Sequence, residues 1–292
     1  MAKEYRTITC TNKKGYSLIF DETSISPFLL TDADGLYNAE YNVTTVTNGN
    51  VDGSTFVGRQ LKERNIVLTV LDIDMFARNR ELLDKVFSCG GTLIYDDGIH
   101  KRKIDYIVEK VSGTDGTFKK RTHQISLICP NPYFTDLEDN DIAMSYIDSL
   151  FEFPHEFVDE EISKIIKTQN IEILNEDGVE TGMTILLEAN GKVVNPSLSL
   201  EETGETLMLG INGSMDFILE ANQKVEITTQ VRNCFVRLIK SDGSKENINQ
   251  YLTSDSSFLR LQTGVNHLSY VAKSGADNLN VTISYKNNYL EV

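Results

Sequence analysis

The two halves of the chain differ sharply in charge, and this difference constrains the fold more than any other feature of the sequence. Residues 1–135 carry 17 basic and 17 acidic side chains, whereas residues 136–292 carry 11 basic and 26 acidic ones, so the second half holds the whole formal charge of −15. The change falls just after a segment with two prolines, residues 129–134. A composition shift beside prolines is typical of a domain boundary, so the sequence predicts two domains.

We expect a first domain at residues 1–135, an acidic connector at residues 136–168 and a second domain at residues 169–292. Within the connector, residues 136–161 include ten acidic residues and no Lys or Arg, and we expect its phenylalanines to pack on one of the domains. A chain of 292 residues is near the size at which a single hydrophobic core stops growing. The length therefore agrees with two cores.

The first half alternates apolar and polar residues in the manner of β-strands. Strands are predicted at residues 17–20, 64–73, 92–95, 99–111 and 118–129. Asp97-Gly98 predicts a two-residue hairpin turn, because glycine supplies the positive φ that such a turn needs. Residues 74–88 instead place their apolar side chains at helical spacing, with Asp74 as a candidate N-cap and Gly90-Gly91 as the stop.

A long Gly-, Asn- and Thr-rich stretch, residues 30–64, separates the early strands of the first half. A loop of this length inside a compact domain is usually functional, and the alternation at residues 41–47 favours an extended hairpin arm. We expect this arm to contact a neighbouring subunit, with Tyr37, Tyr41 and Phe56 as the candidate contact face.

The second half repeats short strand-like runs between turns, with no convincing helix. They lie at residues 171–174, 183–189, 196–200, 206–211, 216–219, 224–229, 234–239, 259–261, 267–271 and 279–285. Many short strands with turn signals between them predict a β-sandwich. The predicted fold is thus mainly β in both domains.

Motifs that carry chemistry are absent from the sequence. The four histidines have no metal-ligand spacing, and neither a nucleophile elbow, a phosphate-binding loop nor a dinucleotide fingerprint is present. The Asp32–Gly35 and Asn175–Gly178 segments resemble calcium loops but lack both anchoring carboxylates, so we interpret them as turns. We predict no catalytic, cofactor-binding or metal-binding residues, and no enzyme activity.

The four cysteines and the start of the chain suggest synthesis in a reducing compartment. Cys10, Cys89, Cys129 and Cys234 show no paired spacing, so we expect free thiols. The first residues lack the apolar stretch of a secretory signal, and no apolar run is long enough to span a membrane. We therefore expect no membrane partner.

Two basic clusters in the first half, residues 100–103 and 119–121, leave two interpretations open. They could face nucleic acid, or they could offset nearby acids or lie at a subunit contact, which the neutral balance of this half favours. We expect no specific nucleic-acid partner, because the chain as a whole is strongly negative. The absence of tryptophan weakens, but does not exclude, carbohydrate binding by the second domain.

The order of these features resembles one family, the distal tail proteins of long-tailed phages, which also occur in phage-like bacteriocins. In the first domain the matching elements are residues 52–54, residues 64–66, the helix, Gly90-Gly91, two successive hairpins that turn at residues 97–98 and 113–116, and residues 129–134. In the second domain they are residues 173–178, 180–182, 195–196, 203–207, 258–261 and 264–266, followed by a final strand that ends at residues 285–289. Each motif is mostly turn chemistry, so the order and spacing carry the resemblance, which covers almost the full length.

The resemblance implies a structural role. Family members form a hexameric ring at the tail tip, so the expected partners are further copies of this chain, the tail tube protein, the tail-associated hub protein and receptor-binding or baseplate proteins. The first domain would form the ring around a channel for DNA, with one α-helix and the hairpin arm, and the second would be a galectin-like β-sandwich. The resemblance places the protein at the virion tail tip, after synthesis in the host cytoplasm. A carbohydrate-binding adhesin that acts through the second domain remains the alternative.

Overall fold

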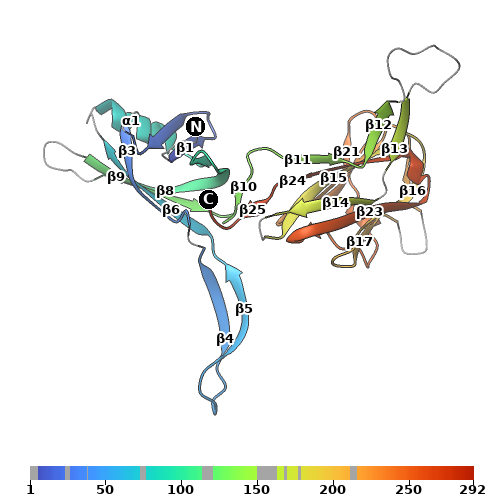
Figure 1. Ribbon diagram of the computed structural model, residues 1–292, viewed down its shortest axis with the longest axis horizontal. Helices are drawn as coiled ribbons and strands as arrows, with labels where there is room; N and C mark the ends of the chain where they lie inside the picture. Colours follow the sequence, from blue (N-terminus) through green and yellow to red (C-terminus); the bar gives the residue numbers. More distant parts are fainter. Residues whose placement is uncertain are drawn as a thin grey trace. The chain divides into compact units, whose positions relative to one another are not determined.

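The protein forms two compact units in the computed structural model (Figure 1). The structure describes residues 6–23, 27–37, 39–72, 77–113, 121–149, 163–167, 170–176, 179–210 and 216–292. The first unit consists of Met1–Leu137 together with Asn288–Val292, and the second of Glu138–Asn287. By sequence the first unit carries 17 basic and 19 acidic side chains, a net of −2, and the second carries 11 and 24, a net of −13. The charge difference therefore follows the division into units.

Strands of the first unit form one large sheet. They are β1 (Thr7–Asn12), β2 (Ser17–Asp21), β3 (Phe28–Asp34), β6 (Arg64–Asp72), β7 (Gly91–Asp96), β8 (Lys101–Gly113), β9 (Arg121–Cys129), β10 (Phe134–Thr135) and β25 (Asn288–Tyr289). The order is β25-β10-β8-β7-β1-β2-β3-β6-β9, with a further pairing of β8 and β9. Because β9 pairs back onto β8, seven of these strands close into a barrel-like circuit.

The long strand β8 makes this closure possible. Its first part pairs with β7 as far as Tyr106, and its second part pairs with β9 from Ile107 onward, with a register shift between Val108 and Lys110. Such a shift bends a strand and increases its twist, which lets one strand serve two neighbours in sequence. Inward-facing side chains of the circuit form the core of this unit. They include Phe20, Phe28, Leu68, Leu93 and Ile125, each fully buried.

One helix covers this sheet, as the sequence predicts. Helix α1 spans Ala77–Val86 and buries Leu83 and Val86 against the barrel strands, and Phe87 follows it. The carbonyl of Lys85 in its last turn accepts a hydrogen bond from Asn12 at 3.0 Å. The predicted N-cap Asp74 lies outside the described residues.

The stop after the helix depends on a glycine in close contact with the neighbouring strand. A Cβ at Gly91 would lie 2.1 Å from the carbonyl oxygen of Thr11 in β1, so no larger residue fits without moving backbone. The loop between β7 and β8 differs from the prediction. Asp96 pairs with Lys101, so the loop has four residues rather than two, and the Asp97 carboxylate accepts backbone hydrogen bonds from Ile99 and His100.

The last five residues, Asn288–Val292, belong to the first unit, whereas the sequence predicts them in the second domain. Phe134 pairs with Tyr289 and Thr135 with Asn288, which adds β25 to the edge of the sheet at β10. Tyr289 also belongs to the hydrophobic core of the first unit. The physical reason is long-range strand pairing, which no local pattern in residues 288–292 reveals.

The second unit is a β-sandwich of two sheets around one core. One sheet has the order β11-β24-β15-β19-β20-β21, with β22 paired to β15, and the other has the order β14-β23-β16-β17, with β18 paired to β16. The first comprises β11 (Asn140–Ala143), β15 (Thr181–Ala189), β19 (Lys224–Gln230), β20 (Asn233–Ile239), β21 (Lys245–Asn247), β22 (Arg260–Leu261) and β24 (Leu279–Tyr285). The second comprises β14 (Asn170–Asn175), β16 (Val193–Leu200), β17 (Glu205–Met208), β18 (Ile218–Leu219) and β23 (Gly264–Ser274).

Part of the segment expected to be a connector is strand. β11 pairs along its length with β24 of the sandwich, and β12 (Ser145–Ser149) pairs with β13 (Ser163–Lys167). The three connector phenylalanines, Phe151, Phe153 and Phe157, lie outside the described residues. The prediction of a mainly β protein with a helix in the first domain is confirmed. Within the described residues, no helix is long and apolar enough to cross a membrane.

Candidate functional site

A separate β-hairpin in the first unit exposes an unusual amount of apolar surface. Among the described residues, strands β4 (Tyr41–Val46) and β5 (Thr55–Leu61) pair only with each other, and they extend away from the barrel strands, in blue to cyan in Figure 1. Its exposed apolar residues are Val43, Val46, Val51, Phe56 and Val57, each between 50% and 70% exposed. Exposed apolar side chains gathered on one hairpin make it the candidate docking surface of this unit.

Strand register divides the hairpin into two unlike faces. Tyr41 pairs with Leu61, Val43 with Arg59 and Thr45 with Phe56, and directly paired residues of antiparallel strands share a face. The opposite face carries Asn42 with Gln60, Thr44 with Gly58 and Val46 with Thr55. We call the first set the apolar face of the hairpin and the second, in which Val46 is the one apolar side chain, the polar face. The guanidinium of Arg59 lies over the Tyr41 ring at 4.6 Å, which confirms that both are on one face.

The three residues predicted as the contact face do not have the same surroundings. Tyr41 and Phe56 lie on the apolar face, and Phe56 is 61% exposed. Tyr37 precedes the hairpin, and its hydroxyl lies 3.0 Å from that of Tyr95, a residue of the barrel core. Burial strongly raises the pKa of Tyr95. Tyr37 therefore contacts its own unit, whereas Phe56 makes none of the core contacts of the first unit.

Sequence reasoning missed two other apolar residues, Val43 and Leu61, and the arginine that covers Tyr41. Alternation at residues 41–45 places Val43 with Tyr41, so that signal was available from sequence. The register shift between Thr44 and Thr45 was not, and it decides which residues of β5 join them. A bulge depends on both strands at once, so one strand read alone cannot reveal it.

The residues that join the hairpin to the barrel, on both sides of it, line a polar hollow of about 290 Å³. We call this junction, residues 35–40 and 61–65, the hairpin root. On one side, Lys62 donates its amide to the Glu40 carbonyl at 2.9 Å and its amine to the Glu40 carboxylate at 3.1 Å. On the other, Gly35 turns the chain with φ of 82°, and a Cβ there would lie 2.0 Å from the Asn65 carbonyl oxygen. The chain enters and leaves the hairpin through this one point.

A buried arginine joins the segments around this root. Arg64 is 5% exposed, and its guanidinium donates to the carbonyl oxygens of Pro132 at 2.9 Å, of Gly35 at 2.6 Å and of Leu290. The group also lies over the Phe134 ring at 5.0 Å. Burial lowers the pKa of Arg64 from its usual value. Carbonyl acceptors compensate the lost hydration of the buried cation.

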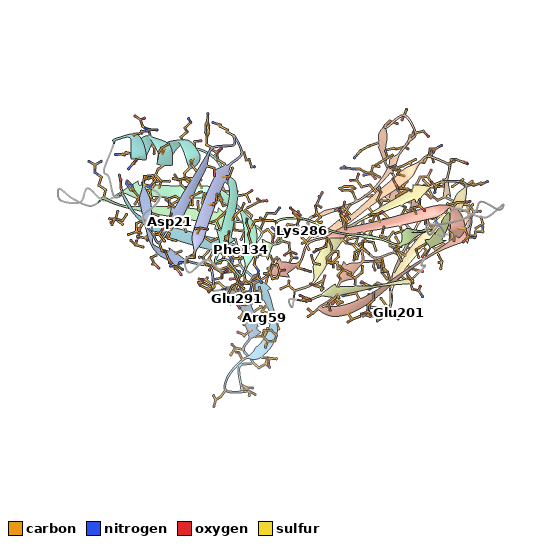
Figure 2. The ribbon with its side chains drawn as sticks, turned by 45° about the horizontal axis from the view of Figure 1, so that its top comes forward. Asp21, Arg59, Phe134, Glu201, Lys286 and Glu291 are labelled. Atoms are coloured by element: carbon orange, nitrogen blue, oxygen red, sulfur yellow. The ribbon has the colours of Figure 1, made fainter. Side chains whose placement is uncertain are left out.

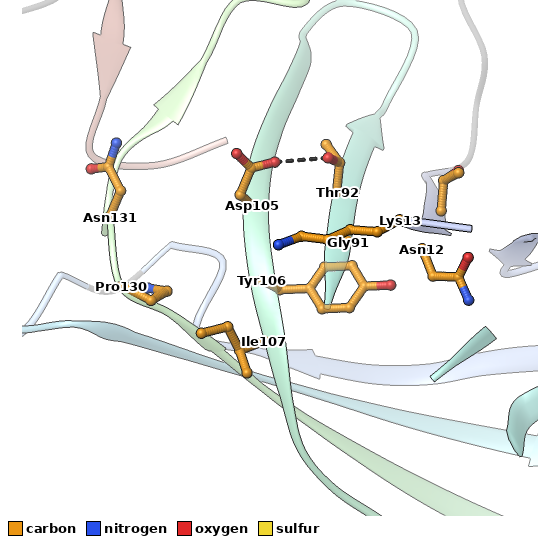
Figure 3. A pocket seen from close by; sticks show the side chains of 10 residues that line it. Asn12, Lys13, Gly91, Thr92, Asp105, Tyr106, Ile107, Pro130 and Asn131 are labelled. Carbon is orange, nitrogen blue, oxygen red and sulfur yellow. Dashed lines mark hydrogen bonds between the residues drawn. The ribbon is translucent and has the colours of Figure 1, made fainter. Parts of the chain in front are cut away.

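A second hollow of the first unit, of about 430 Å³, lies between the start of β7, the middle of β8 and residues 130–131 (Figure 3). Its polar groups are the amine of Lys13, amides, and the Asp105 carboxylate, which accepts a hydrogen bond from Thr92 at 2.7 Å. Tyr106 and Ile107 supply the apolar part of the wall. Among the described residues that line it, none is a histidine or a cysteine.

The first basic cluster has structural partners. Arg102 donates to the Glu291 carbonyl at 2.6 Å and lies over the Tyr289 ring at 3.6 Å, and Lys103 donates to the Leu137 carbonyl at 2.7 Å. Lys101 lies 4.0 Å from the Asp96 carboxylate. These contacts favour the structural interpretation of residues 100–103. Of the second cluster, only Arg121 lies within the described residues.

Residues considered for metal binding or thiol chemistry have structural roles in the described parts of the chain. Asp34 accepts the Gly35 amide at 2.8 Å, as expected for a turn, and no described group of His, Cys, Asp and Glu could hold a metal. All four cysteines are free thiols. Burial raises the pKa of the Cys129 thiol to about 12 and that of Cys10 further, so both are unreactive at neutral pH.

A row of polar side chains crosses the outer face of the smaller sheet in the second unit, and the same face exposes Leu174, Val265 and Val271. Asn170, Ser269, Ser199 and Thr206 lie opposite one another across four strands, and the Ser199 and Ser269 hydroxyls are 2.9 Å apart. Next to this row, His267 forms a 2.7 Å contact with the Glu202 carboxylate. The hydrogen bond with Glu202 raises the pKa of His267.

Comparison with known proteins shows what this architecture is similar to. Residues 178–289 match the model of the SPP1_Dit family, the siphovirus-type tail component, C-terminal domain. The crystal structure of the Dit protein of phage SPP1, described as a paradigm of the hub adsorption apparatus in phages that infect Gram-positive bacteria, is similar with a TM-score of 0.66 and 14% identity. The similarity covers 97% of this chain and 99% of that one.

A second solved structure, a chain of the phage P2 baseplate in its activated conformation with Ca, is similar with a TM-score of 0.51 and 13% identity over 99% of both chains. No curated protein sequence matches. The predicted resemblance to distal tail proteins is confirmed. The chain has the fold of the SPP1 Dit protein and of the similar baseplate chain, and its residues 178–289 match the C-terminal domain of a siphovirus-type tail component.

Proposed function

We propose that this protein is the distal tail hub of a long-tailed phage or phage-like particle, in which six copies form a ring around a channel for DNA. The ring joins the tail tube protein to the tail-associated hub and to the receptor-binding or baseplate proteins at the virion tail tip. The observation that supports this role best is the similarity to SPP1 Dit over almost the full length of both chains. The role is structural rather than enzymatic.

The first unit has the properties that ring formation requires. Its net charge of −2 limits repulsion between copies, whereas the second unit carries −13. The apolar face of the hairpin has no partner strand beyond the hairpin itself, so burial against a neighbouring copy would remove Val43 and Phe56 from water. A ring of heterologous contacts closes when each copy offers one such surface to the next.

The two faces of the hairpin provide a matched test. The Val43→Asp/Phe56→Asp variant places two charges on the apolar face, and the Thr44→Asp/Thr55→Asp variant places two on the polar face. We expect the first variant to remain folded but to be missing from purified tail particles, and the second to be incorporated normally, as measured by electron microscopy and mass spectrometry of the particles. Equal incorporation of both variants, or equal loss, would contradict the assigned contact face.

The second unit is proposed as a connector rather than an adhesin. Sugar binding relies on aromatic side chains that stack on the ring, and the outward-facing row of the smaller sheet consists of amide and hydroxyl side chains. Its net charge of −13 also repels anionic cell-wall polymers. Titration of the full chain with host cell-wall polysaccharide tests this, and saturable micromolar binding would support the adhesin alternative instead.

A further inference from the structure

The return of residues 288–292 to the first unit depends on specific side-chain contacts, and we call this segment the return strand. Arg102 from β8 donates to the Glu291 carbonyl and covers the Tyr289 ring. The Tyr289 hydroxyl donates to Asp136 at 2.8 Å. Figure 2 marks Glu291 at the strand and Phe134 on β10, the strand with which Tyr289 pairs.

Arg64 connects this return strand to the hairpin root. The residue begins β6, directly after the chain leaves the hairpin, and its guanidinium bonds the carbonyls of Gly35 and Leu36, directly before the chain enters it. The same guanidinium donates to Leu290 in the return strand and to Pro132, two residues before β10. One buried side chain therefore contacts both ends of the hairpin root and the return strand.

An arginine is required for this geometry. Its guanidinium is a rigid planar fork with five N–H donors, so several acceptors are bound in a fixed relation to one another. A lysine would present three donors from a single nitrogen atom, so it could not donate at the same time to the carbonyl groups of Gly35, Pro132 and Leu290. Because the fork is rigid and 95% of the residue is buried, displacement of the Leu290 carbonyl shifts the group relative to Gly35 as well.

We propose that Arg64 is a positioning residue that couples docking of the return strand to the order of the hairpin root. When residues 288–292 are docked, Arg64 is held against Gly35 and Leu36, and the hairpin leaves the barrel in one defined direction. When they are released, the root loses that restraint. The consequence for assembly rests on the proposed ring function, whereas the coupling itself is a property of the single chain.

Hydrogen exchange of the full chain as a monomer measures the coupling between the return strand and the hairpin root, because it does not require assembly into a ring. Tyr289→Ala and Arg102→Gln each remove a contact of the return strand, and neither substitution lies at Arg64 or in the hairpin. We expect exchange at residues 35–40 and 60–64 to become about tenfold faster in both variants, the change that loss of one charge-assisted hydrogen bond predicts. Arg64→Lys should accelerate exchange in the root and in the return strand together.

A matched control is Arg237→Gln in the second unit, because Arg237 lies over the Phe235 ring at 3.8 Å, much as Arg102 lies over Tyr289. We expect this variant to leave the root unchanged. Faster exchange confined to the return strand in Tyr289→Ala and Arg102→Gln overturns the coupling. A uniform rise over β6 and β9 also overturns it, because the return strand would then support the whole barrel rather than the root.

The coupling and the proposed function fail separately. If the apolar-face variants enter tail particles normally while the root still responds to Tyr289→Ala, the ring contact is wrong and the coupling stands. If those variants are excluded from particles while the root does not respond, the coupling alone is wrong.

Discussion

Two β-hairpins of the molecule have similar strands but opposite surroundings. Strands β19 and β20 lie inside the larger sheet of the second unit, where Val225, Ile227 and Val236 are fully buried. Strands β4 and β5 pair only with each other, and Val43 and Phe56 are about 60% exposed. Both hairpins alternate apolar and polar residues. The alternation therefore predicts a strand with one apolar face but not which surface covers that face.

The difference shows which apolar surfaces are buried within the chain and which remain exposed. The second unit packs both sheets around one core, and its exposed apolar residues, such as Leu174 and Val271, lie on strands that belong to those sheets. The first unit closes its barrel, and none of its described residues covers Val43 or Phe56 on the apolar face of the hairpin. Isolated two-stranded hairpins are marginally stable in water, so a hairpin of this length is best explained by a partner that stabilises it.

The largest effect should come from truncation in the buried hairpin. Ile227→Ala removes a fully buried side chain, and we expect it to lower the free energy of unfolding by about 2–5 kcal/mol. Phe56→Ala, the matched change in the exposed hairpin, should alter it by less than about 0.5 kcal/mol. Chemical denaturation followed by circular dichroism measures both. A large loss from Phe56→Ala would mean that the exposed hairpin belongs to the core.

Tyr37 should show an intermediate effect that separates it from Phe56. Tyr37→Phe removes the hydroxyl that bonds to Tyr95, and we expect a loss of about 1 kcal/mol, typical of one partly buried hydrogen bond. Incorporation into tail particles should remain normal. A variant that is fully stable but excluded from particles would instead return Tyr37 to the contact face.

Shortening of the exposed hairpin should change stability still less. Asn42 and Gln60 are cross-strand partners, so residues 43–59 can be replaced by Asn-Gly, the sequence preferred in two-residue hairpin turns. We expect the free energy of unfolding to change by less than about 0.6 kcal/mol, because loop entropy depends weakly on loop length. Thermal unfolding measures this, and a collapse of the first unit would show that the hairpin stabilises its own barrel.

The smallest effects concern two histidines, one in each unit. Burial lowers the pKa of His123, which is 8% exposed, below the ordinary value of 6.5, whereas the hydrogen bond with Glu202 raises the pKa of His267 above it. NMR titration should resolve the two in this order. Glu202→Gln should lower the pKa of His267 and leave that of His123 unchanged, and equal pKa values would contradict both assignments.

The two shifts have opposite consequences for stability. The stabilisation from His267 is fully present below pH 6.5 and is lost as the pH rises through its folded pKa. For His123, the unfolded chain binds a proton more readily than the folded chain, so the first unit loses stability as the pH falls from 6.5 through the folded pKa. Below pH 6.5, mild acid should therefore destabilise the first unit through His123, while the stabilisation from His267 in the second unit is retained.

Much of the fold could be predicted because its signals are local. The predicted strands at residues 64–73 and 279–285 correspond to β6 and β24, and the helix follows from apolar residues at helical spacing. The Asp97 turn was predicted in the right place but with the wrong length. The backbone amides of Ile99 and His100 donate to the Asp97 carboxylate and stabilise a longer loop, and these hydrogen bonds depend on the loop conformation itself.

The site was predictable only in part. An arm could be inferred from a long Gly- and Thr-rich stretch with alternation, and Phe56 lies on its apolar face. Tyr37 is an aromatic residue of the same stretch, but its hydroxyl bonds to that of Tyr95, which is 58 residues away in sequence. Arg64 resembles an ordinary surface arginine in sequence, since nothing local indicates that four carbonyl groups surround it.

The sequence by itself determined the two-unit division, through its charge balance, and the strand content, through alternation and turn residues. It also determined the likeness to distal tail proteins, through the order of short motifs. Tertiary structure alone decided the closure of β9 onto β8, the return of residues 288–292 and the burial of Arg64. The physical reason is that propensity and periodicity act over a few residues, whereas strand closure and burial depend on partners that lie tens to hundreds of residues apart.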